Sequence, residues 1–463
     1  MPSYQPHKHW IQYRTGSGDG YYPFALWREK ALLLRLIGKW EATEAILRAN
    51  LETAIKSDDE RSVAQAQTDL SAICDTRGKV DEAFSLAQNA SLIWEKLNDK
   101  PGLVRATGTL GSVYHHRSEY SKAVDCYKTC LELSRQAGLD KDICHMLNLL
   151  GLISHETDDT PTALKYYGES MEIARRNDDP HYMAMADGNT GNVYLELDQL
   201  DEAMECYQRA LKESQRAGNK QAIAFAIGNI AIIFQKKGDY AKAMQWNRQQ
   251  FDTYTEMGDL MHLAVSLLNM GVIYMDTGQH GQAIECFLKQ IALSRQLNDK
   301  PILSYGSYKL GVAHSENGNF TEAQKAFDQS VEVARSIGFN HYLCGYLSRL
   351  AKLHLEQGRP DLARLYITEA KEIAARVNRP DVMFDLDVLS ARLAATENKE
   401  TAIEKLQAII PTAANDAQKA EVLLQIYRLA GGEDYRQQAA ELFRKLYDKI
   451  PNYQYKKTLA ELT

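Results

Sequence analysis

Two groups of residues in this 463-residue chain have side chains that can bind metal ions. Cys126 and Cys130 lie one helical turn apart, as paired zinc ligands do, but no second pair follows at zinc-site spacing. His115 and His116 are joined by His155 one sequence repeat later, and neither a cysteine nor a carboxylate is spaced to complete a site with them. We therefore predict small core cysteines, structural or partner-contacting histidines, and no metal ion.

Paired carboxylates, which serve as general acids and bases in many enzymes, occur at Asp158-Asp159 and Asp178-Asp179. Each pair stands just before a proline in a short break between helical patterns, where aspartate is favoured as a turn residue and helix cap. The chain has no glycine-rich phosphate loop, no G-x-S-x-G sequence and no H-E-x-x-H sequence. The sequence therefore predicts no catalytic residue and no cofactor.

The composition of the chain indicates which kinds of partner and which cellular compartment to expect. The chain has 54 basic and 61 acidic residues, a formal charge of −7, which disfavours general binding to nucleic acid or to membrane surfaces. Seven scattered cysteines do not form a disulfide framework, which favours a reducing compartment. The N-terminus lacks a signal-peptide pattern, and the longest nearly apolar run, 222–234, is too short for a bilayer. We expect a cytoplasmic protein with neither a nucleic-acid nor a membrane partner.

The helices that must position these residues follow a strict internal repeat of forty residues, as from Leu110 to Leu150. One column holds an apolar residue followed by a small one: Leu70-Ser71, Leu110-Gly111, Leu150-Gly151, Ile230-Ala231, Met270-Gly271, Leu310-Gly311 and Leu350-Ala351, with Thr190-Gly191 in the same phase. A second column is alanine in every copy, from Ala83 to Ala363. The forty-residue period holds without insertion over 59–378, which predicts eight equal units.

Each unit is predicted to be a pair of helices. In 264–277 the apolar residues recur at helical spacing, and Gly278 follows where a left-handed helix end favours glycine. A second helix is predicted from about Gln282 to Leu297. Gly271 and Ala283 are small enough to let the two helices approach closely. One pair cannot bury its apolar face alone, but stacked neighbours can.

These columns resemble the tetratricopeptide repeat, as in Leu310-Gly311 with Gly318, and in Gly191, Tyr194, Ala203 and Tyr207. The forty-residue length resembles the long-repeat branch, which includes cortical adaptors of the Pins/LGN type, kinesin light chains and bacterial peptide sensors of the Rap and PlcR type. The resemblance implies an all-α fold: a right-handed superhelical solenoid of stacked antiparallel helix pairs, whose first helices line a concave groove.

The ends of the chain depart from the repeat. Residues 25–58 are predicted to form an atypical first helix pair, 379–411 a degenerate repeat, and 412–463 helices that cap the stack. Residues 1–24 have no helical period but contain six aromatic side chains. Two interpretations of this segment stay open: an arm packed on the first pair or a linker to another domain, and an arm that binds a partner.

The resemblance places the residue before each Leu-Gly pair on the groove. In three successive repeats this residue is asparagine: Asn189, Asn229 and Asn269. Asparagine costs about 0.6 kcal/mol relative to alanine inside a helix, so a recurring asparagine has another use. Its amide both donates and accepts, and can therefore hold the backbone of an extended peptide. The alternative is that each asparagine bonds to the neighbouring helix.

Later copies of the same column are basic. Lys309 and Arg349 occupy it, and Lys352 follows one turn later, which predicts a basic end of the groove that holds an acidic group of the partner. Arg105 is an isolated arginine in the column where arginine binds acidic targets in Pins/LGN-type proteins. The predicted peptide-binding set is completed by three aromatic residues on the same side: Phe225, Tyr305 and Tyr308. An acidic rim is predicted at the ends of the first helices, at Glu156, Glu196, Asp276, Glu316 and Glu356.

Three functions are compatible with these features. The first is a non-enzymatic scaffold that binds a protein segment or peptide in its concave groove. The second, implied by the resemblance, is a sensory or regulatory subunit in complex with a separate enzyme, such as a caspase-like peptidase of the CHAT type or a cyclase. The third is a structural oligomer formed through an exposed apolar patch of Tyr427, Leu442, Phe443 and Tyr447.

Overall fold

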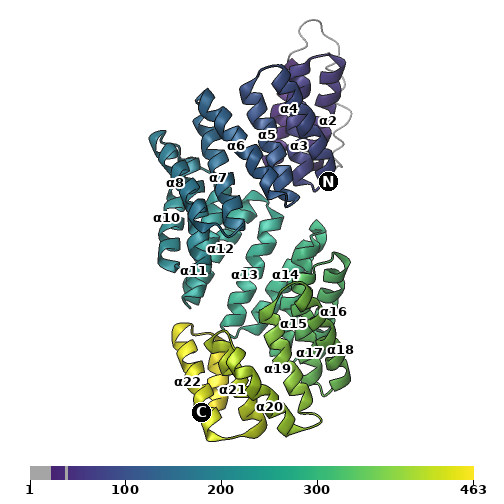
Figure 1. The fold of residues 1–463 in the computed structure, drawn as a ribbon, viewed down its shortest axis with the longest axis vertical. Coiled ribbons are helices and arrows are strands. Elements are labelled where there is room, and N and C mark those ends of the chain that lie inside the picture. The colour runs from purple at the N-terminus through teal and green to yellow at the C-terminus, as the bar shows by residue number, and fades with distance from the viewer. Residues whose placement is uncertain (1–21, 37–39) are drawn as a thin grey trace, which may run out of the picture. The chain divides into compact units, whose positions relative to one another are not determined.

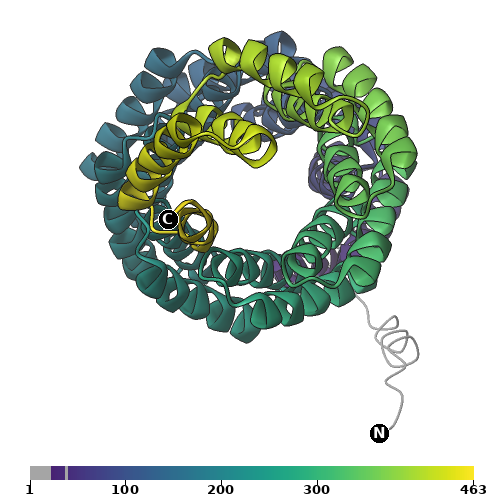
Figure 2. The ribbon, with the colours of Figure 1, turned by 90° about the horizontal axis from the view of Figure 1, so that it is seen from below.

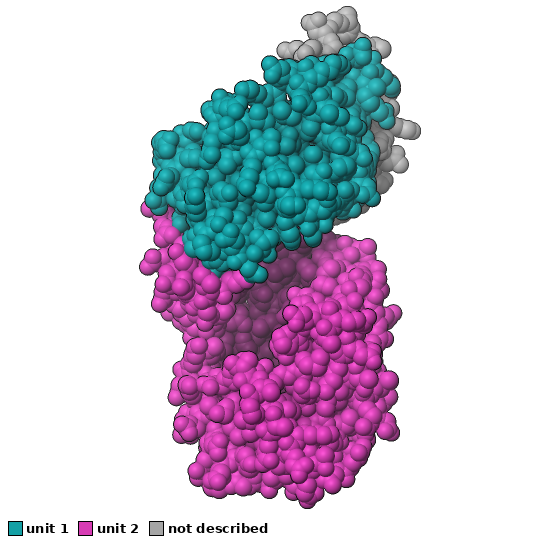
Figure 3. Space-filling view, viewed as in Figure 1, with its two compact units in different colours: residues 1–193 teal, residues 194–463 magenta. Residues whose placement is uncertain are grey.

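The computed structural model describes residues 22–36 and 40–463. Over these residues the fold contains helices and turns but no strand, and consecutive helices of similar length pack in antiparallel pairs (Figure 1). The predicted all-α tetratricopeptide-type solenoid is confirmed. The chain divides into two compact units, 1–193 and 194–463, which are coloured separately in Figure 3 and are described here one at a time.

The described residues of unit 1 form four and a half helix pairs. Its helices are α1 (Tyr22–Leu36), α2 (Trp40–Lys56), α3 (Glu60–Thr76), α4 (Val80–Lys96), α5 (Lys100–His116), α6 (Tyr120–Ala137), α7 (Asp140–Glu156), α8 (Thr160–Arg176) and most of α9 (Pro180–Glu196). The first helices α5, α7 and α9 begin one full period apart, as the repeat predicts. The predicted N-terminal arm, 1–24, lies outside the described residues apart from 22–24, which begin α1.

Unit 2 continues the repeat and ends in shorter helices. Its helices are α10 (Leu200–Ala217), α11 (Lys220–Lys236), α12 (Tyr240–Met257), α13 (Leu260–Asp276), α14 (His280–Leu297), α15 (Lys300–Glu316), α16 (Phe320–Ser336), α17 (Asn340–Glu356), α18 (Pro360–Arg376), α19 (Pro380–Ala394), α20 (Lys399–Ile409), α21 (Asp416–Ala430), α22 (Glu433–Lys449) and α23 (Tyr453–Leu462). A short 3₁₀ turn, Ile410–Thr412, follows α20.

The turns between helices explain why the helices end at regular intervals along the chain. From Asp58 to Asn378 a left-handed residue stands at every twentieth position, for example Asp158 with φ of 61° and Gly238 with φ of 75°. The side chain of Asp159 then accepts a hydrogen bond from the Thr162 N–H, which caps the next helix. The sequence interpretation of Asp158 and Asp159 as turn and cap residues is confirmed.

Close packing within each pair depends on the small residue of the first column. A Cβ atom on Gly151 would lie 2.4 Å from Cε1 of Tyr167, and one on Gly271 would lie 2.4 Å from Cε1 of Phe287. Both rings are fully buried. Glycine therefore makes room for the aromatic ring of the second helix, and this ring fills the core of the pair.

The C-terminal helices form their own small core and return to the middle of unit 2. Phe443 is only 5% exposed and packs with Leu423 and Leu424, so the predicted exposed apolar patch is wrong at this residue. The start of α23 reaches the turn after α13, where its first residue, Tyr453, fits against Gly278. Figure 2 shows the yellow C-terminal helices inside the curve formed by the green helices of the same unit.

Among the described residues, no helix combines the length and the apolar character needed to cross a membrane.

Candidate functional site

The structure brings three predicted basic residues, Lys309, Arg349 and Lys352, into one cavity of about 460 Å³ in unit 2. We call it the charged cavity. It is lined by the first helices α13, α15, α17 and α19, by the start of α14, by α21 and by the start of α23. Its polar residues are Asp276, His280, Lys309, Glu316, Ser348, Arg349, Lys352, Asp385, Arg392, Glu421, Asn452, Tyr453 and Gln454. Apolar side chains such as Val272 and Leu389 complete the lining.

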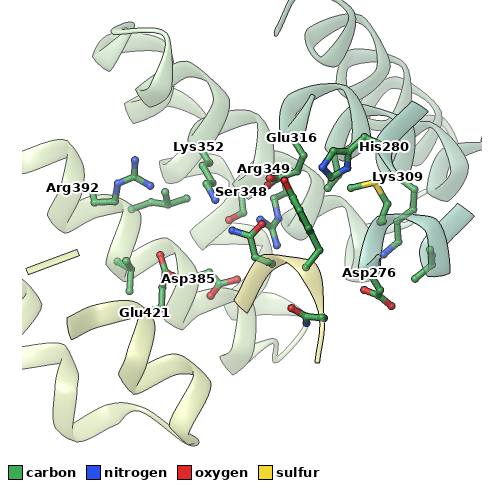
Figure 4. Close-up of a pocket in the computed structure, with 18 residues that line it drawn as sticks. Asp276, His280, Lys309, Glu316, Ser348, Arg349, Lys352, Asp385, Arg392 and Glu421 are labelled. Atoms are coloured by element: carbon green, nitrogen blue, oxygen red, sulfur yellow. The ribbon is translucent and has the colours of Figure 1, made fainter. Parts of the chain in front are cut away.

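The repeat explains this convergence. Lys309 on α15 and Arg349 on α17 are one full period apart, so the same position of two stacked first helices faces the same space. Lys352 lies one turn further along α17 and therefore points to the same side. In Figure 4 Arg349 and Lys352 lie in the middle of the cavity, with Arg392 at one end and Lys309 and Asp276 at the other.

The cations of the charged cavity share it with four carboxylates, Asp276, Glu316, Asp385 and Glu421, but form few direct ion pairs. Within the part of the chain that the structure describes, Lys309, Arg349 and Arg392 form no ion pair within 4.0 Å, and Lys352 approaches Glu356 only to 4.0 Å. Burial and the neighbouring Arg349 lower the pKa of Lys352. Burial also lowers the pKa of Arg392 and raises the pKa of Asp385. The nearby Tyr308, Asp385 and Glu316 raise the pKa of Arg349. The cavity therefore holds buried charges of both signs, and an added anion would stabilise Lys352 and Arg392.

Sequence reasoning missed Arg392, Asp385 and Glu421. Arg392 lies one full period after Lys352, so extending the basic column into the degenerate repeat would have found it. Asp385 likewise follows Tyr305 by two periods. Glu421 is on α21, after the phase is lost, and nothing in the local sequence marks it.

The predicted aromatic residues occupy two places in unit 2. Tyr305 and Tyr308 lie on α15, where the Lys309 ammonium stands 5.2 Å and 5.8 Å from their ring centroids. Tyr308 stacks on Tyr346 of α17 with centroids 4.8 Å apart. Phe225 on α11 is 44% exposed and does not line the charged cavity. The cluster beside Lys309 offers an aromatic surface next to the basic residues.

The three predicted asparagines have different surroundings. Asn189 in unit 1 donates to Oδ1 of Asn148 at 3.0 Å, which matches the alternative of a bond to the neighbouring helix. Asn229 donates to the Phe225 carbonyl of its own helix at 3.1 Å. The Asn269 amide has no hydrogen-bond partner among the described residues. Neither Asn229 nor Asn269 lines the charged cavity.

Polar side chains of unit 1 are largely paired with one another. Arg105 is exposed and its guanidinium donates to Gln65 at 3.2 Å. His115 lies 2.6 Å from Glu156, and His116 lies 2.8 Å from Asp75. Sequence spacing indicated no carboxylate partner for these histidines, because the partners belong to neighbouring repeats and stacking alone brings them together.

Cysteine chemistry is restrained by burial. Of the seven free cysteines, six are buried and Cys126 is half-buried. Burial raises the pKa of the Cys130 thiol to about 12 and that of Cys126 to about 11. Thiols with such raised pKa values are poor nucleophiles and poor metal ligands near neutral pH, which agrees with the prediction of core cysteines.

One group among the described residues has metal-ligand spacing: Glu44, Cys74 and Glu82. Cations already surround its buried carboxylate, because Glu44 accepts from Arg48 at 2.6 Å, Arg77 at 2.5 Å and Lys79 at 2.6 Å. Lys79, followed by the two arginines, lowers the pKa of Glu44 to about 2. The group is a structural charge network in unit 1.

The chain was compared with known proteins. A family model described as a tetratricopeptide repeat matches residues 76–136, 142–211, 182–256, 262–336 and 302–376, which together span more than half of the chain. No curated protein sequence matches significantly.

Three solved structures illustrate the similarity of fold. Aspartyl phosphate phosphatase F from Bacillus subtilis is 14% identical, with a TM-score of 0.50 over 78% of this chain and 96% of its own. A signal-transduction ATPase from Pyrococcus horikoshii with a tetratricopeptide repeat sensor is 12% identical, with a TM-score of 0.52 over 74% of this chain and 52% of its own. A Rap protein in complex with competence and sporulation factor is 13% identical, with a TM-score of 0.49 over 87% of this chain and 98% of its own.

Proposed function

Since this chain belongs to the tetratricopeptide-repeat family, we propose that it is a non-enzymatic interaction scaffold of the cytoplasm. It binds a peptide or a segment of a partner protein along the inner face of its first helices. The ligand places an acidic group in the charged cavity of unit 2. The buried free cysteines agree with a reducing compartment.

The observation that carries the proposal is the set of four cations in one cavity, three of which form no direct ion pair within 4.0 Å among the described residues. Holding charged groups partly away from bulk water without direct ion pairs costs free energy, so a protein that keeps Lys309, Arg349, Lys352 and Arg392 together has a use for them. Carboxylates and phosphates are the groups that arginine and lysine bind best.

The surroundings of the cations favour a peptide segment over a free small anion. Tyr305 and Tyr308 extend the surface on α15, and both tyrosines stay partly exposed. Aromatic side chains contribute contact area at low cost in conformational entropy. An acidic residue bound at Arg349 would leave its flanking residues within reach of this aromatic surface.

Fluorescein-labelled hexaglutamate is a suitable probe, and its binding can be followed by fluorescence anisotropy. We expect Lys352→Gln to weaken binding, and the wild-type affinity to fall as salt is raised. Lys289→Gln is the matched control, because Lys289 is an exposed lysine on the second helix α14 and the change in net charge is the same. Equal affinities of the two variants, or an affinity that does not respond to salt, would contradict the proposal.

A further inference from the structure

The last helix of the chain lies in the inner space of unit 2, far along the sequence from its contacts. A Cβ atom on Gly238 would lie 2.4 Å from Cδ of Pro451, and Tyr453 packs on Gly278 and on the ring of His280, with centroids 5.3 Å apart. Further along α23, Lys457 reaches Glu316 at 3.4 Å. We call residues 451–462 the C-terminal strap.

The C-terminal strap is also firmly anchored at its far end. Leu462 is 1% exposed in the core of the C-terminal helices, and Thr458 is buried as well. Glu461 forms a bidentate pair with Arg428 at 2.8 Å and 2.6 Å. The strap therefore bridges α22 and the turns that follow α11 and α13.

The C-terminal strap forms part of the charged cavity. Asn452, Tyr453 and Gln454 line it together with the predicted basic residues. A second, smaller hollow of about 270 Å³ places Lys457 and Glu461 beside Arg349, Lys352 and Arg392. The inner face of the first helices is thus closed on one side by the chain's own C-terminus.

The strap could either compete with the ligand or form a wall of the ligand site, and the placement of its charges distinguishes these two roles. A strap that imitates the ligand would place a carboxylate on the basic residues. The single acidic residue of α23, Glu461, is instead held by Arg428, and the strap leaves Arg349 and Arg392 without an ion pair within 4.0 Å among the described residues. The strap itself therefore does not occupy the position of an acidic ligand on these residues.

We propose that the C-terminal strap is a wall of the ligand site, which completes the charged cavity and is required for tight binding of an acidic segment. This inference rests on the proposed function and adds the polar side chains of Asn452 and Gln454 to the site. A strap that is already ordered before binding raises affinity, because no conformational entropy of the strap is lost when the complex forms. A cavity of about 460 Å³ is within the usual range of ligand pockets.

The test uses full-length protein and the hexaglutamate probe. Tyr453→Ala removes the contact with Gly278 and His280 without changing any charge, and we expect binding to weaken about tenfold as the wall loosens. Tyr447→Ala is the matched control, because Tyr447 is on α22, is half-exposed and does not line the cavity. We expect its affinity to equal that of the wild type.

Hydrogen exchange of the wild-type protein supplies a second measurement that needs no variant. If the strap is a wall, the probe slows exchange in 451–462; if it is a competitor, the probe speeds exchange there. Equal affinity of the two tyrosine variants, or faster exchange, would overturn the role of the strap while leaving the acidic-ligand site intact. Absence of any probe binding to the wild type would instead overturn the proposed site, and the wall with it.

Inorganic phosphate tests whether an isolated anion is sufficient. If phosphate alone slows the exchange as hexaglutamate does, the ligand is a free anion and the proposed acidic segment is wrong.

Discussion

The asparagine column yields a prediction that separates binding from structural roles. Asn189→Ala and Asn229→Ala are the same substitution at equivalent positions of successive repeats. Asn189 donates to the carboxamide oxygen of Asn148, which is 3% exposed. The amide of Asn148 is already used, since it donates to Ser170 at 2.7 Å and to the Cys144 carbonyl at 2.8 Å.

The magnitudes follow from these contacts. Removing Asn189 leaves a buried acceptor without its donor, which costs about 1–3 kcal/mol, and the alanine returns about 0.6 kcal/mol of helix propensity. We expect a net loss near 1 kcal/mol, which corresponds to a fall in melting temperature of about 1 °C when the whole chain unfolds cooperatively. Asn229 bonds only to its own helix at an exposed carbonyl, so its replacement should leave stability unchanged or raise it by up to about 0.6 kcal/mol.

The assay is thermal and urea unfolding of the two single variants beside the wild type. Repeat arrays sum local stabilities, so the two substitutions should act independently. An Asn189→Ala variant as stable as the wild type would refute the reasoning from the Asn148 contact. An Asn229→Ala variant that loses more stability than Asn189→Ala would refute the distinction between the two sites.

Three further predictions concern packing, pH and reactivity. Gly151→Ala should destabilise the protein by about 1–3 kcal/mol, because its Cβ would meet the Tyr167 ring, whereas Gly168→Ala on α8 has open space and should stabilise it; urea unfolding compares them. The ionised Glu44 carboxylate stabilises the folded state fully above pH 4.5, its ordinary pKa, and this stabilisation is lost as the pH falls toward about 2. The melting temperature of the wild type should therefore fall over that pH range, and that of Glu44→Gln should fall less steeply. Cys130 should resist a thiol reagent at mildly alkaline pH until the protein is unfolded, as mass spectrometry of the labelled peptides would show; rapid labelling of the native protein would contradict the burial.

Much of the fold is determined by the sequence alone. The forty-residue period, the glycine beside each aromatic ring and the turn residues at every twentieth position act within one helix pair or between neighbours. Such short-range rules can be read from spacing, so the helix pairs and the resemblance to the tetratricopeptide repeat were predicted and are confirmed. The meeting of Lys309, Arg349 and Lys352 follows from the same rules.

Contacts outside the period were decided only by the tertiary structure. Asn189 has the same type and register as Asn229, but its partner Asn148 is absent from the equivalent site, where Gly188 stands. The C-terminal strap approaches Gly238 and Gly278 from several repeats further along the chain, and Glu421 enters the cavity from a helix outside the repeat. Periodicity specifies which face of a helix is buried against its neighbours. It carries no information about which distant segment returns to cover the face that remains, and in this protein that return shapes the site.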